Sequence, residues 1–393
     1  MFFNISPTVD HRFPYNFSLN FATFNCDAGW RKADTTNGII FAKGYCDTCS
    51  IDELLNNFDG AGAGEYSGNF CLVKFTDKVE IAHNKNRGFP LRFSENSVTN
   101  LFTDAPYQTA WADDSIQIDL NWKITTNKIN LDTVISSDSL SITNAGNKIF
   151  NLLVNDIDGF ISNNNSSDLK LFCSGGLDTL LLYSLLIYTN TKFDLLTDNH
   201  YTIDSFTEIN KSELENNWAY KQIHHWNQPS CIATGGCGDE YFLRGPTVIS
   251  MMTAWNNIEF NRLLTESVDS YHYRHFSKYD IWQTDWNNRA LLQQQYPTQE
   301  LLHQQILNIL LNDHQHWHLG NTLTYTPFKN IEIVKILLQC SVEDLLPQFL
   351  DGQISKSLIS NVDPALLKSV SKYKNFNSTE NLSKLIHYNI NEN

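Results

Sequence analysis

The sequence predicts a mixed α/β and α+β protein in two domains. Residues 1–130 are expected to form an antiparallel β-layer domain, and residues 131–393 a domain with a parallel sheet and helices. Short strand-like runs joined by polar turns fill the first third. A helix, a strand, a glycine loop and a second helix then follow one another, which is typical of α/β architecture. From about residue 250 onward the apolar spacing is mostly helical.

Hairpin signals carry the prediction for the first domain. The runs "NFCLVKF" and "VEIAHNK" are separated by the polar residues 76–78, and "PLRFS" and "SVTNLF" by a turn at Glu95 and Asn96. The run "TNGIIFAKGY" is a further strand candidate. Short strands with polar turns favour an antiparallel, layered arrangement.

The character of the chain changes near residues 125–145. The stretch "ITTNKINLDTVISSDSLSITNAG" is rich in Ser, Thr and Asn and predicts an inter-domain connection. "NKIFNLLVNDIDGFI" has helical apolar spacing, and "LKLFC" reads as a strand. Farther on, "LLHQQILNILL" and "NIEIVKILLQC" are the clearest helices.

Composition narrows the classes of function. The net charge of −15 argues against a general nucleic-acid binder, which would usually carry a basic stripe. The start of the chain lacks the pattern of a signal peptide, and no apolar run reaches the length of a membrane helix. The eight cysteines are scattered, as expected for reduced thiols in a cytoplasmic protein.

Two patterns resemble metal sites without completing one. Cys46 and Cys49 form a single C-x-x-C, but no second pair at zinc-finger spacing follows, so we interpret them as incidental thiols. "NDHQHWHLGN" places His314 and His318 four residues apart, but no third ligand is identifiable. A polar helix surface is the better interpretation of these histidines.

The segment "CSGGLDT" lies between a predicted strand and a predicted helix. Glycines there let backbone N–H groups approach an anion closely, and a helix N-terminus favours phosphate. Ser174 and Thr179 can donate hydroxyl hydrogen bonds, whereas Asp178 would repel a bare phosphate. The aspartate therefore indicates Mg²⁺ between the carboxylate and the phosphate. A plain Gly-Gly turn with an aspartate at the start of a helix is the alternative.

A second segment, "CIATGGCGDEYF", repeats the arrangement of strand, glycine loop and acidic helix start. Two such loops in one sheet can face each other at the carboxyl ends of the strands, where α/β proteins bind ligands. Asp178 and Asp239 would then form a carboxylate pair for one metal ion.

These two loops resemble the nucleotide-binding motifs of known enzyme families. Residues 174–179 resemble the S-G-G-x-D-[ST] pyrophosphate loop of the ATP pyrophosphatase families, and residues 234–240 resemble the S-G-x-G-x-D-E motif of asparagine synthetase. Such enzymes adenylate a carboxylate, release pyrophosphate and let an amine displace AMP. The resemblance implies an adenine-nucleotide-α-hydrolase-like second domain, ATP and Mg²⁺ as cofactors, and Asp178 and Asp239 as metal ligands. It implies that ATP is bound by the two loops, at Ser174, Gly175, Gly176, Leu177, Asp178, Thr179, Gly235 and Gly236.

The resemblance extends to both ends of the chain. "DGQISKSLIS" resembles the family's G-x-x-K-x-x-L-R, which implies that Lys356 neutralises charge on the transferring groups, with Lys372 and Lys374 as helpers. The first 130 residues resemble the glutaminase-type, Ntn-hydrolase-like domain. That domain uses a cysteine directly after the initiator methionine, where this chain has Phe2, which has no nucleophilic atom. We therefore expect a degenerate, non-functional glutaminase, as in β-lactam synthetase and lasso-peptide cyclase.

Other positions depart from the family pattern. Leu323, Tyr325 and Asn330 stand where the family places glutamate, arginine and aspartate. These losses argue against aspartate as the substrate. Tyr325, beside the lost site, and Glu240, after the second metal aspartate, are candidates for the acceptor site and its base.

Three functions follow as hypotheses. The first is an ATP-dependent, AMP-forming carbon–nitrogen ligase that acts on a small-molecule or peptide carboxylate with ammonia or a substrate-borne amine. The second adenylates the carbonyl of a nucleotide or base for amination. The third is a non-catalytic pseudo-enzyme used as a binding or assembly module. The sequence excludes a membrane partner and leaves the oligomeric state open.

Overall fold

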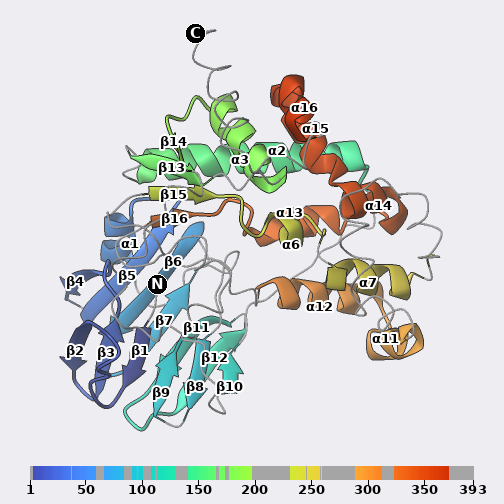
Figure 1. The fold of residues 1–393 in the computed structure, drawn as a ribbon. Helices are drawn as coiled ribbons and strands as arrows, with labels where there is room; N and C mark the ends of the chain where they lie inside the picture. Colours follow the sequence, from blue (N-terminus) through green and yellow to red (C-terminus); the bar gives the residue numbers. More distant parts are fainter. Residues whose placement is uncertain are drawn as a thin grey trace.

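A computed structural model of the chain describes residues 3–36, 38–58, 66–83, 91–94, 96–100, 108–110, 113–128, 140–164, 168–172, 177–196, 231–244, 246–256, 258, 288–311 and 323–370. The protein is mixed α/β, with two antiparallel sheets in its first part and a parallel sheet flanked by helices in its second (Figure 1). The prediction of a mixed α/β protein with antiparallel strands first and a parallel sheet later is confirmed. The domain boundary predicted at residue 130 lies outside the described residues.

The first antiparallel sheet, sheet A, has the strand order β10-β8-β9-β1-β3-β2. Its strands are β1 (Phe3–Ser6), β2 (Tyr15–Leu19), β3 (Ala22–Cys26), β8 (Leu91–Ser94), β9 (Ser97–Thr99) and β10 (Gln108–Ala110). The predicted hairpin of "PLRFS" and "SVTNLF" is confirmed, because β8 and β9 pair antiparallel.

The second antiparallel sheet, sheet B, has the order β12-β11-β7-β6-β5-β4. It contains β4 (Arg31–Thr35), β5 (Gly38–Cys46), β6 (Gly68–Phe75), β7 (Val79–His83), β11 (Asp113–Ile118) and β12 (Ile124–Lys128), and helix α1 (Ile51–Asn57) follows β5. The predicted hairpin of β6 and β7 and the strand in "TNGIIFAKGY" are both confirmed.

Apolar side chains fill the space between the two sheets. Phe24 of sheet A and Phe41 of sheet B are fully buried, with ring centroids 4.6 Å apart. The other face of sheet B packs on α1, where Leu72 and Leu54 belong to one buried cluster. Because sheet B is covered on both faces, β6 is buried at every position instead of alternating.

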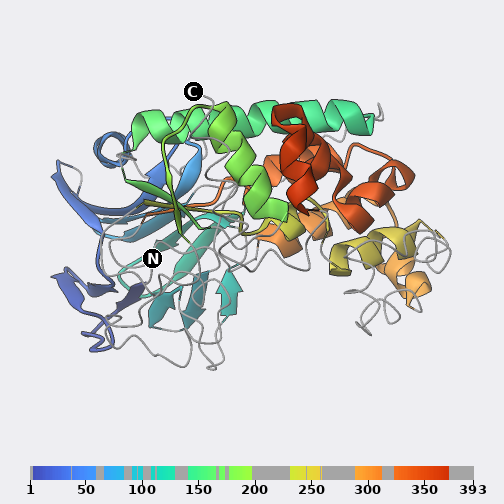
Figure 2. The same cartoon turned by 45° about the horizontal axis from the view of Figure 1, so that its top comes forward.

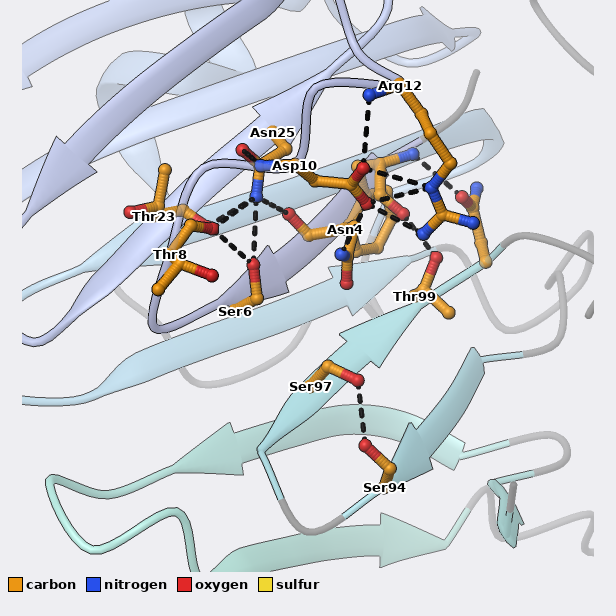
Figure 3. Close-up of polar contacts among 12 residues, drawn as sticks. Asn4, Ser6, Thr8, Asp10, Arg12, Thr23, Asn25, Ser94, Ser97 and Thr99 are labelled. Carbon is orange, nitrogen blue, oxygen red and sulfur yellow. Dashed lines mark hydrogen bonds and ion pairs between the residues drawn. The ribbon is translucent and has the colours of Figure 1, made fainter. Parts of the chain in front are cut away.

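Strands β1 and β3 of sheet A carry polar but buried side chains on the outer face of the sheet (Figure 3). Asn25 Nδ2 donates to the carbonyl of Asn4 at 3.1 Å and to Ser6 Oγ at 3.0 Å. The backbone N–H of Asp10 donates to Asn25 Oδ1 at 2.8 Å, and the Asp10 carboxylate accepts from Arg12 at 2.7 Å. This network fastens the segment after β1 over the sheet and replaces the water that polar side chains would otherwise contact.

The parallel sheet of the second part has the order β14-β13-β15-β16. Its elements are α2 (Ile142–Asn163), β13 (Leu169–Phe172), α3 (Leu177–Tyr188), β14 (Asp194–Leu196), β15 (Cys231–Thr234) and β16 (Leu323–Tyr325). The strands in "LKLFC" and "CIAT" are confirmed. Strand β16 was not expected.

Helices make up most of the remaining chain. They are α6 (Gly238–Tyr241), α7 (Pro246–Trp255), α11 (Arg289–Gln295), α12 (Gln299–Leu311), α13 (Ile331–Leu337), α14 (Val342–Asp351), α15 (Gln353–Val362) and α16 (Pro364–Val370). The helices in "LLHQQILNILL" and "NIEIVKILLQC" are confirmed. None of the described helices is long and apolar enough to cross a membrane.

The prediction of a single polar connection near residues 125–145 is wrong at both its ends. Its first residues form strand β12, and α2 begins at Ile142. Ser141 caps this helix, because its side chain accepts from the backbone N–H of Asn144 at 3.4 Å. Some of the polar residues that indicated a loop belong to the edge strand β12 or to the N-cap of α2.

Helix α2 joins the two parts of the molecule. Figure 2 shows it reaching from the β-layer part to the helices near the end of the chain. At its C-terminal end the Asn163 amide donates to the carbonyl of Asp47 at 2.6 Å, and the Asn164 amide to the carbonyl of Cys46 at 2.9 Å. Tyr45 packs edge-on against Phe160 of α2, with ring centroids 5.0 Å apart.

Candidate functional site

The first predicted phosphate loop lies between β13 and α3. Ser174, Gly175 and Gly176 fall outside the described residues. Helix α3 begins at Leu177, and Asp178 lies in its first turn, where the helix dipole favours a negative charge. Thr179 follows and is buried.

The second loop lies between β15 and α6, the neighbouring strand and the helix that follows it. Thr234 Oγ1 accepts from the backbone N–H of Gly236 at 3.2 Å, so the strand ends in a side-chain-capped turn. Cys237 has a left-handed backbone, with φ of +62°. This conformation turns the chain sharply enough for α6 to begin at Gly238.

The two loops touch. A Cβ at Gly235 would lie only 2.6 Å from the backbone nitrogen of Thr179, and a Cβ at Gly238 would overlap the carboxylate of Asp178. Glycine at both positions therefore allows the second loop to pack on the first turn of α3. Of the predicted facing arrangement, the structure describes the contact between the second loop and the first turn of α3.

Arg244 connects the two acidic residues. Its Nη2 lies against Asp178 Oδ1 and 2.9 Å from Asp239 Oδ1. Two oxygens that bind one nitrogen are at most about 6 Å apart, so a single cation can serve both carboxylates. The Arg244 side chain is 1% exposed, Asp178 18% and Asp239 53%, so the cluster opens to solvent on the side of Asp239.

The first turn of α15 and the end of α14 hold this arginine in place. Gly352 has a φ of +66°, and a Cβ there would lie 3.2 Å from Arg244 Nη1 and 2.5 Å from Leu177 Cδ2. The buried Gln348 side chain donates to the carbonyl of Phe242 at 3.1 Å and accepts from the backbone N–H of Ile354 at 2.6 Å. Gln348 thereby ties the loop that carries Arg244 to the start of α15.

Lys356 lies one turn after Gly352, on the helix that packs against α3. Its Nζ is 2.6 Å from Asp351 Oδ2, and both side chains are partly exposed. Glu240 is partly exposed in α6, directly after Asp239. Both residues are therefore on elements that border the Asp178–Arg244–Asp239 cluster. Lys372 and Lys374 lie outside the described residues.

Tyr325 lies elsewhere. It is fully buried in β16, its hydroxyl is 2.9 Å from Asp156 Oδ1 of α2, and its ring stacks on Phe160 at a centroid distance of 4.0 Å. It also contacts Tyr45 of β5 edge-on. A side chain so enclosed belongs to the joint between the two parts of the chain, and its acceptor-site role stays a prediction.

The charges of the cluster are strongly coupled. Burial raises the pKa of the Asp178 carboxyl, the guanidinium of Arg244 lowers it, and the neighbouring charge of Asp239 raises it again. Removing Arg244 would leave burial and the Asp239 charge unopposed and would raise the pKa of the Asp178 carboxyl further.

The donor set fits magnesium. Mg²⁺ is usually held by one or two carboxylates together with phosphate oxygens, and Asp178 and Asp239 supply such a pair. Among the described residues no group of three or more His, Cys, Asp or Glu side chains could hold a metal. The histidines of "NDHQHWHLGN" lie outside the described residues.

Sequence reasoning missed Arg244, Gln348 and Gly352. The signal for Gln348 was a polar side chain on the apolar side of a helix, which needs partners when buried. Arg244 follows Asp239 by only five positions, but its contact with Asp178 depends on tertiary packing.

No protein-family model matches this chain, and no protein in the curated set that was searched matches it either.

Proposed function

We propose that this chain is an ATP- and Mg²⁺-dependent ligase, which activates a carboxylate as an acyl-adenylate, releases pyrophosphate and passes the acyl group to an amine. One observation carries the proposal. Asp178 and Asp239, each following a glycine loop, converge on one cation, the guanidinium of Arg244. They do so past the carboxyl ends of neighbouring parallel strands, where α/β proteins bind ligands.

We assign the second part of the chain to an adenine-nucleotide-α-hydrolase-like fold and the first to a degenerate Ntn-hydrolase-like fold. The four-stranded parallel sheet with α2 and α3 supports the former, and the two packed antiparallel sheets support the latter. With a degenerate glutaminase-like part, the amine of the proposed reaction is free ammonia or a group on the substrate itself.

Each residue of the site has a role in this reaction. Asp178 and Asp239 would hold Mg²⁺, which when bound neutralises charge on the phosphate oxygens. The first turn of α3, with Thr179, offers N–H and hydroxyl donors to pyrophosphate. A carboxylate oxygen of the substrate attacks the α-phosphorus of ATP, and the bond to pyrophosphate breaks. Lys356 balances the charge of that leaving group.

The amine then attacks the acyl carbon, and the bond to AMP breaks. The proton that the amine loses needs an acceptor, and Glu240 is the candidate base because it is partly exposed beside Asp239. Arg244 would leave at least one of its two carboxylates when Mg²⁺ enters. Its guanidinium can then bind phosphate oxygens, for which its planar fork is suited.

A second candidate is a non-catalytic binding module. The observation in its favour is that the Arg244 guanidinium already binds both carboxylates, so the pair has a positive partner without a metal. In that case the Arg244 guanidinium permanently occupies the position that Mg²⁺ would take in the enzyme.

Binding and exchange assays separate the two. Wild-type chain would be titrated with a non-hydrolysable ATP analogue with and without Mg²⁺, and pyrophosphate–ATP exchange measured with pools of amino acids, dicarboxylic acids and peptides. The ligase binds nucleotide only with Mg²⁺ and loses both signals in Asp178→Asn. Asp52→Asn, in an exposed ion pair with Arg31, is the matched control and keeps them. Absence of binding at millimolar nucleotide would favour the module.

A further inference from the structure

Two thiols face each other in the turn that follows β5. Cys46 is the last residue of that strand, and Cys49 precedes Ser50, the N-cap of α1. The Cys49 thiol donates a hydrogen bond to Cys46 Sγ, with the sulfurs 3.4 Å apart. We refer to residues 46–49 as the thiol turn.

The thiol turn is also the place where the two parts of the chain are fastened together. The carbonyls of Cys46 and Asp47 accept the side-chain amides at the end of α2. Gly159 of α2 packs so closely that a Cβ there would lie 2.7 Å from the carbonyl oxygen of Asp47. Asp47 is held from its other side, because its N–H donates to the carbonyl of Ser67 at 2.8 Å.

We propose that Cys46 and Cys49 are a redox modification site, at which exchange with a low-molecular-weight disulfide closes a reversible disulfide within the joint. Disulfide formation needs the sulfurs to approach to about 2.05 Å, a movement of roughly 1.4 Å from their present separation. Side-chain rotation within a four-residue turn can supply that movement without unpacking β5.

The position of the two thiols sets the order of steps. Cys49 lies at the rim, 7% exposed and next to the exposed Thr48, whereas Cys46 is fully buried. The Cys49 thiolate attacks one sulfur of the small disulfide, whose other half leaves as a thiol. Cys46 then attacks Cys49 in this mixed disulfide and expels the second small thiol. Two protein thiols lose two electrons and two protons, and one small disulfide becomes two thiols.

The environment makes this exchange slow. Burial raises the pKa of Cys49 most, and the hydrogen bond to Cys46 and the charges of Cys46 and Glu53 add to it. The pKa is about 12, although a hydrogen bond with Thr48 lowers it somewhat. The nucleophilic thiolate is therefore scarce at neutral pH, and we expect closure over hours. The pair lacks the stabilised thiolate of a catalytic dithiol, so it suits a response to sustained oxidation.

The test uses the full chain and oxidised glutathione at pH 8. We expect the wild type to lose the mass of two hydrogen atoms, peptide mapping to join residue 46 to residue 49, and dithiothreitol to reverse both. Cys46→Ser should keep a glutathionyl adduct on Cys49, because no resolving thiol is in contact. Cys49→Ser should gain no adduct at the buried Cys46. Cys71→Ser, which removes a fully buried thiol in β6, is the matched control and should close as the wild type does.

A second measurement keeps the proposal testable if either serine variant fails to fold. Amide hydrogen exchange of the wild type should slow several-fold over residues 156–164 on oxidation, because the closed turn restrains the carbonyls that hold the end of α2. Free thiols after a day with excess oxidised glutathione, a stable adduct on the wild type, or a bond to another cysteine would overturn the proposal. Closure without any change in α2 would overturn its coupling to the joint.

Discussion

Arg244 and Asp178 form an ion pair in which the guanidinium is almost fully enclosed, and the same nitrogen also binds Asp239. A positive side chain therefore lies where the proposed reaction would place a metal ion. An arginine and a magnesium ion satisfy a carboxylate pair by the same electrostatics, but only the metal can be exchanged with solvent. The stability of the cluster without its arginine is thus the most direct measure of what the site is built to hold.

We predict that Arg244→Gln makes the folded chain dependent on divalent cations. Without Mg²⁺ the free energy of unfolding should fall by about 3 kcal/mol. This is the lower end of the cost of breaking a buried ion pair, because the Asp239 side chain is half exposed. Millimolar Mg²⁺ should restore much of the loss, since it replaces the missing positive charge. Urea denaturation with and without Mg²⁺ measures both effects.

Arg31→Gln is the matched control for that experiment, because it removes an arginine from an exposed ion pair with Asp52. It should cost less than about 1 kcal/mol in either condition. Equal destabilisation of Arg244→Gln with and without Mg²⁺ would mean that the carboxylate pair does not bind the metal and would favour the non-catalytic module.

A pair of glycines on α2 tests the joint between the two parts. Gly159→Ala would place a Cβ 2.7 Å from the carbonyl oxygen of Asp47, so the helix must shift, and we expect a loss of about 1–3 kcal/mol. Gly146→Ala, on the same helix, would meet Ile354 at an ordinary 3.9 Å and should stabilise by about 0.5–1 kcal/mol. Thermal denaturation of the two variants should move in opposite directions. A stabilising Gly159→Ala would show that the thiol turn is not packed on α2.

Tyr325→Phe separates a structural from a catalytic role for that residue. The substitution removes the hydroxyl that donates to Asp156 at 2.9 Å in a buried site, so the free energy of unfolding should fall by about 1–3 kcal/mol. Because the ring and its stacking on Phe160 remain, nucleotide binding measured by calorimetry should stay unchanged. A stable variant with weakened nucleotide binding would mean that the Tyr325 hydroxyl takes part in the active site.

Local features of the fold could be predicted from the sequence and long-range ones could not. The β6–β7 and β8–β9 hairpins have their turn chemistry between adjacent strands, so a short window shows the whole unit. Strand β16 has three residues and pairs in parallel with β15, about ninety positions earlier. Neither alternation nor a turn marks so short a strand.

The candidate site divides in the same way. The glycine loops and Asp178 and Asp239 are visible because each loop combines glycines, a preceding apolar run and an acidic helix start. The role of Arg244 depends on the approach of two loops and on Gly352 from a third segment, which no local pattern shows. The surroundings of Tyr325 could not be predicted either, because its position beside a family motif said nothing about the packing of α2 and β5 around it.

His303 of α12 is a buried titratable group outside the proposed site. The side chain is 1% exposed, and Nδ1 is buried without a hydrogen-bond partner among the residues that the structure describes. Its Nε2 lies 3.4 Å from the side-chain amide nitrogen of Gln299. Burial lowers the pKa of His303 to about 4.

This histidine should make the chain acid-sensitive below about pH 6.5. The unfolded chain binds the proton near pH 6.5 and the folded chain only near 4, so stability falls as the pH decreases through that window, by about 3 kcal/mol in total. Above pH 6.5 the effect is absent. Urea denaturation at pH 7.5 and 5 should show a smaller loss for His303→Gln than for the wild type, by about 2 kcal/mol. His11→Gln, which removes an exposed histidine, should leave the wild-type pH dependence in place. An unchanged loss in His303→Gln would mean that the ring is already solvated in the folded chain.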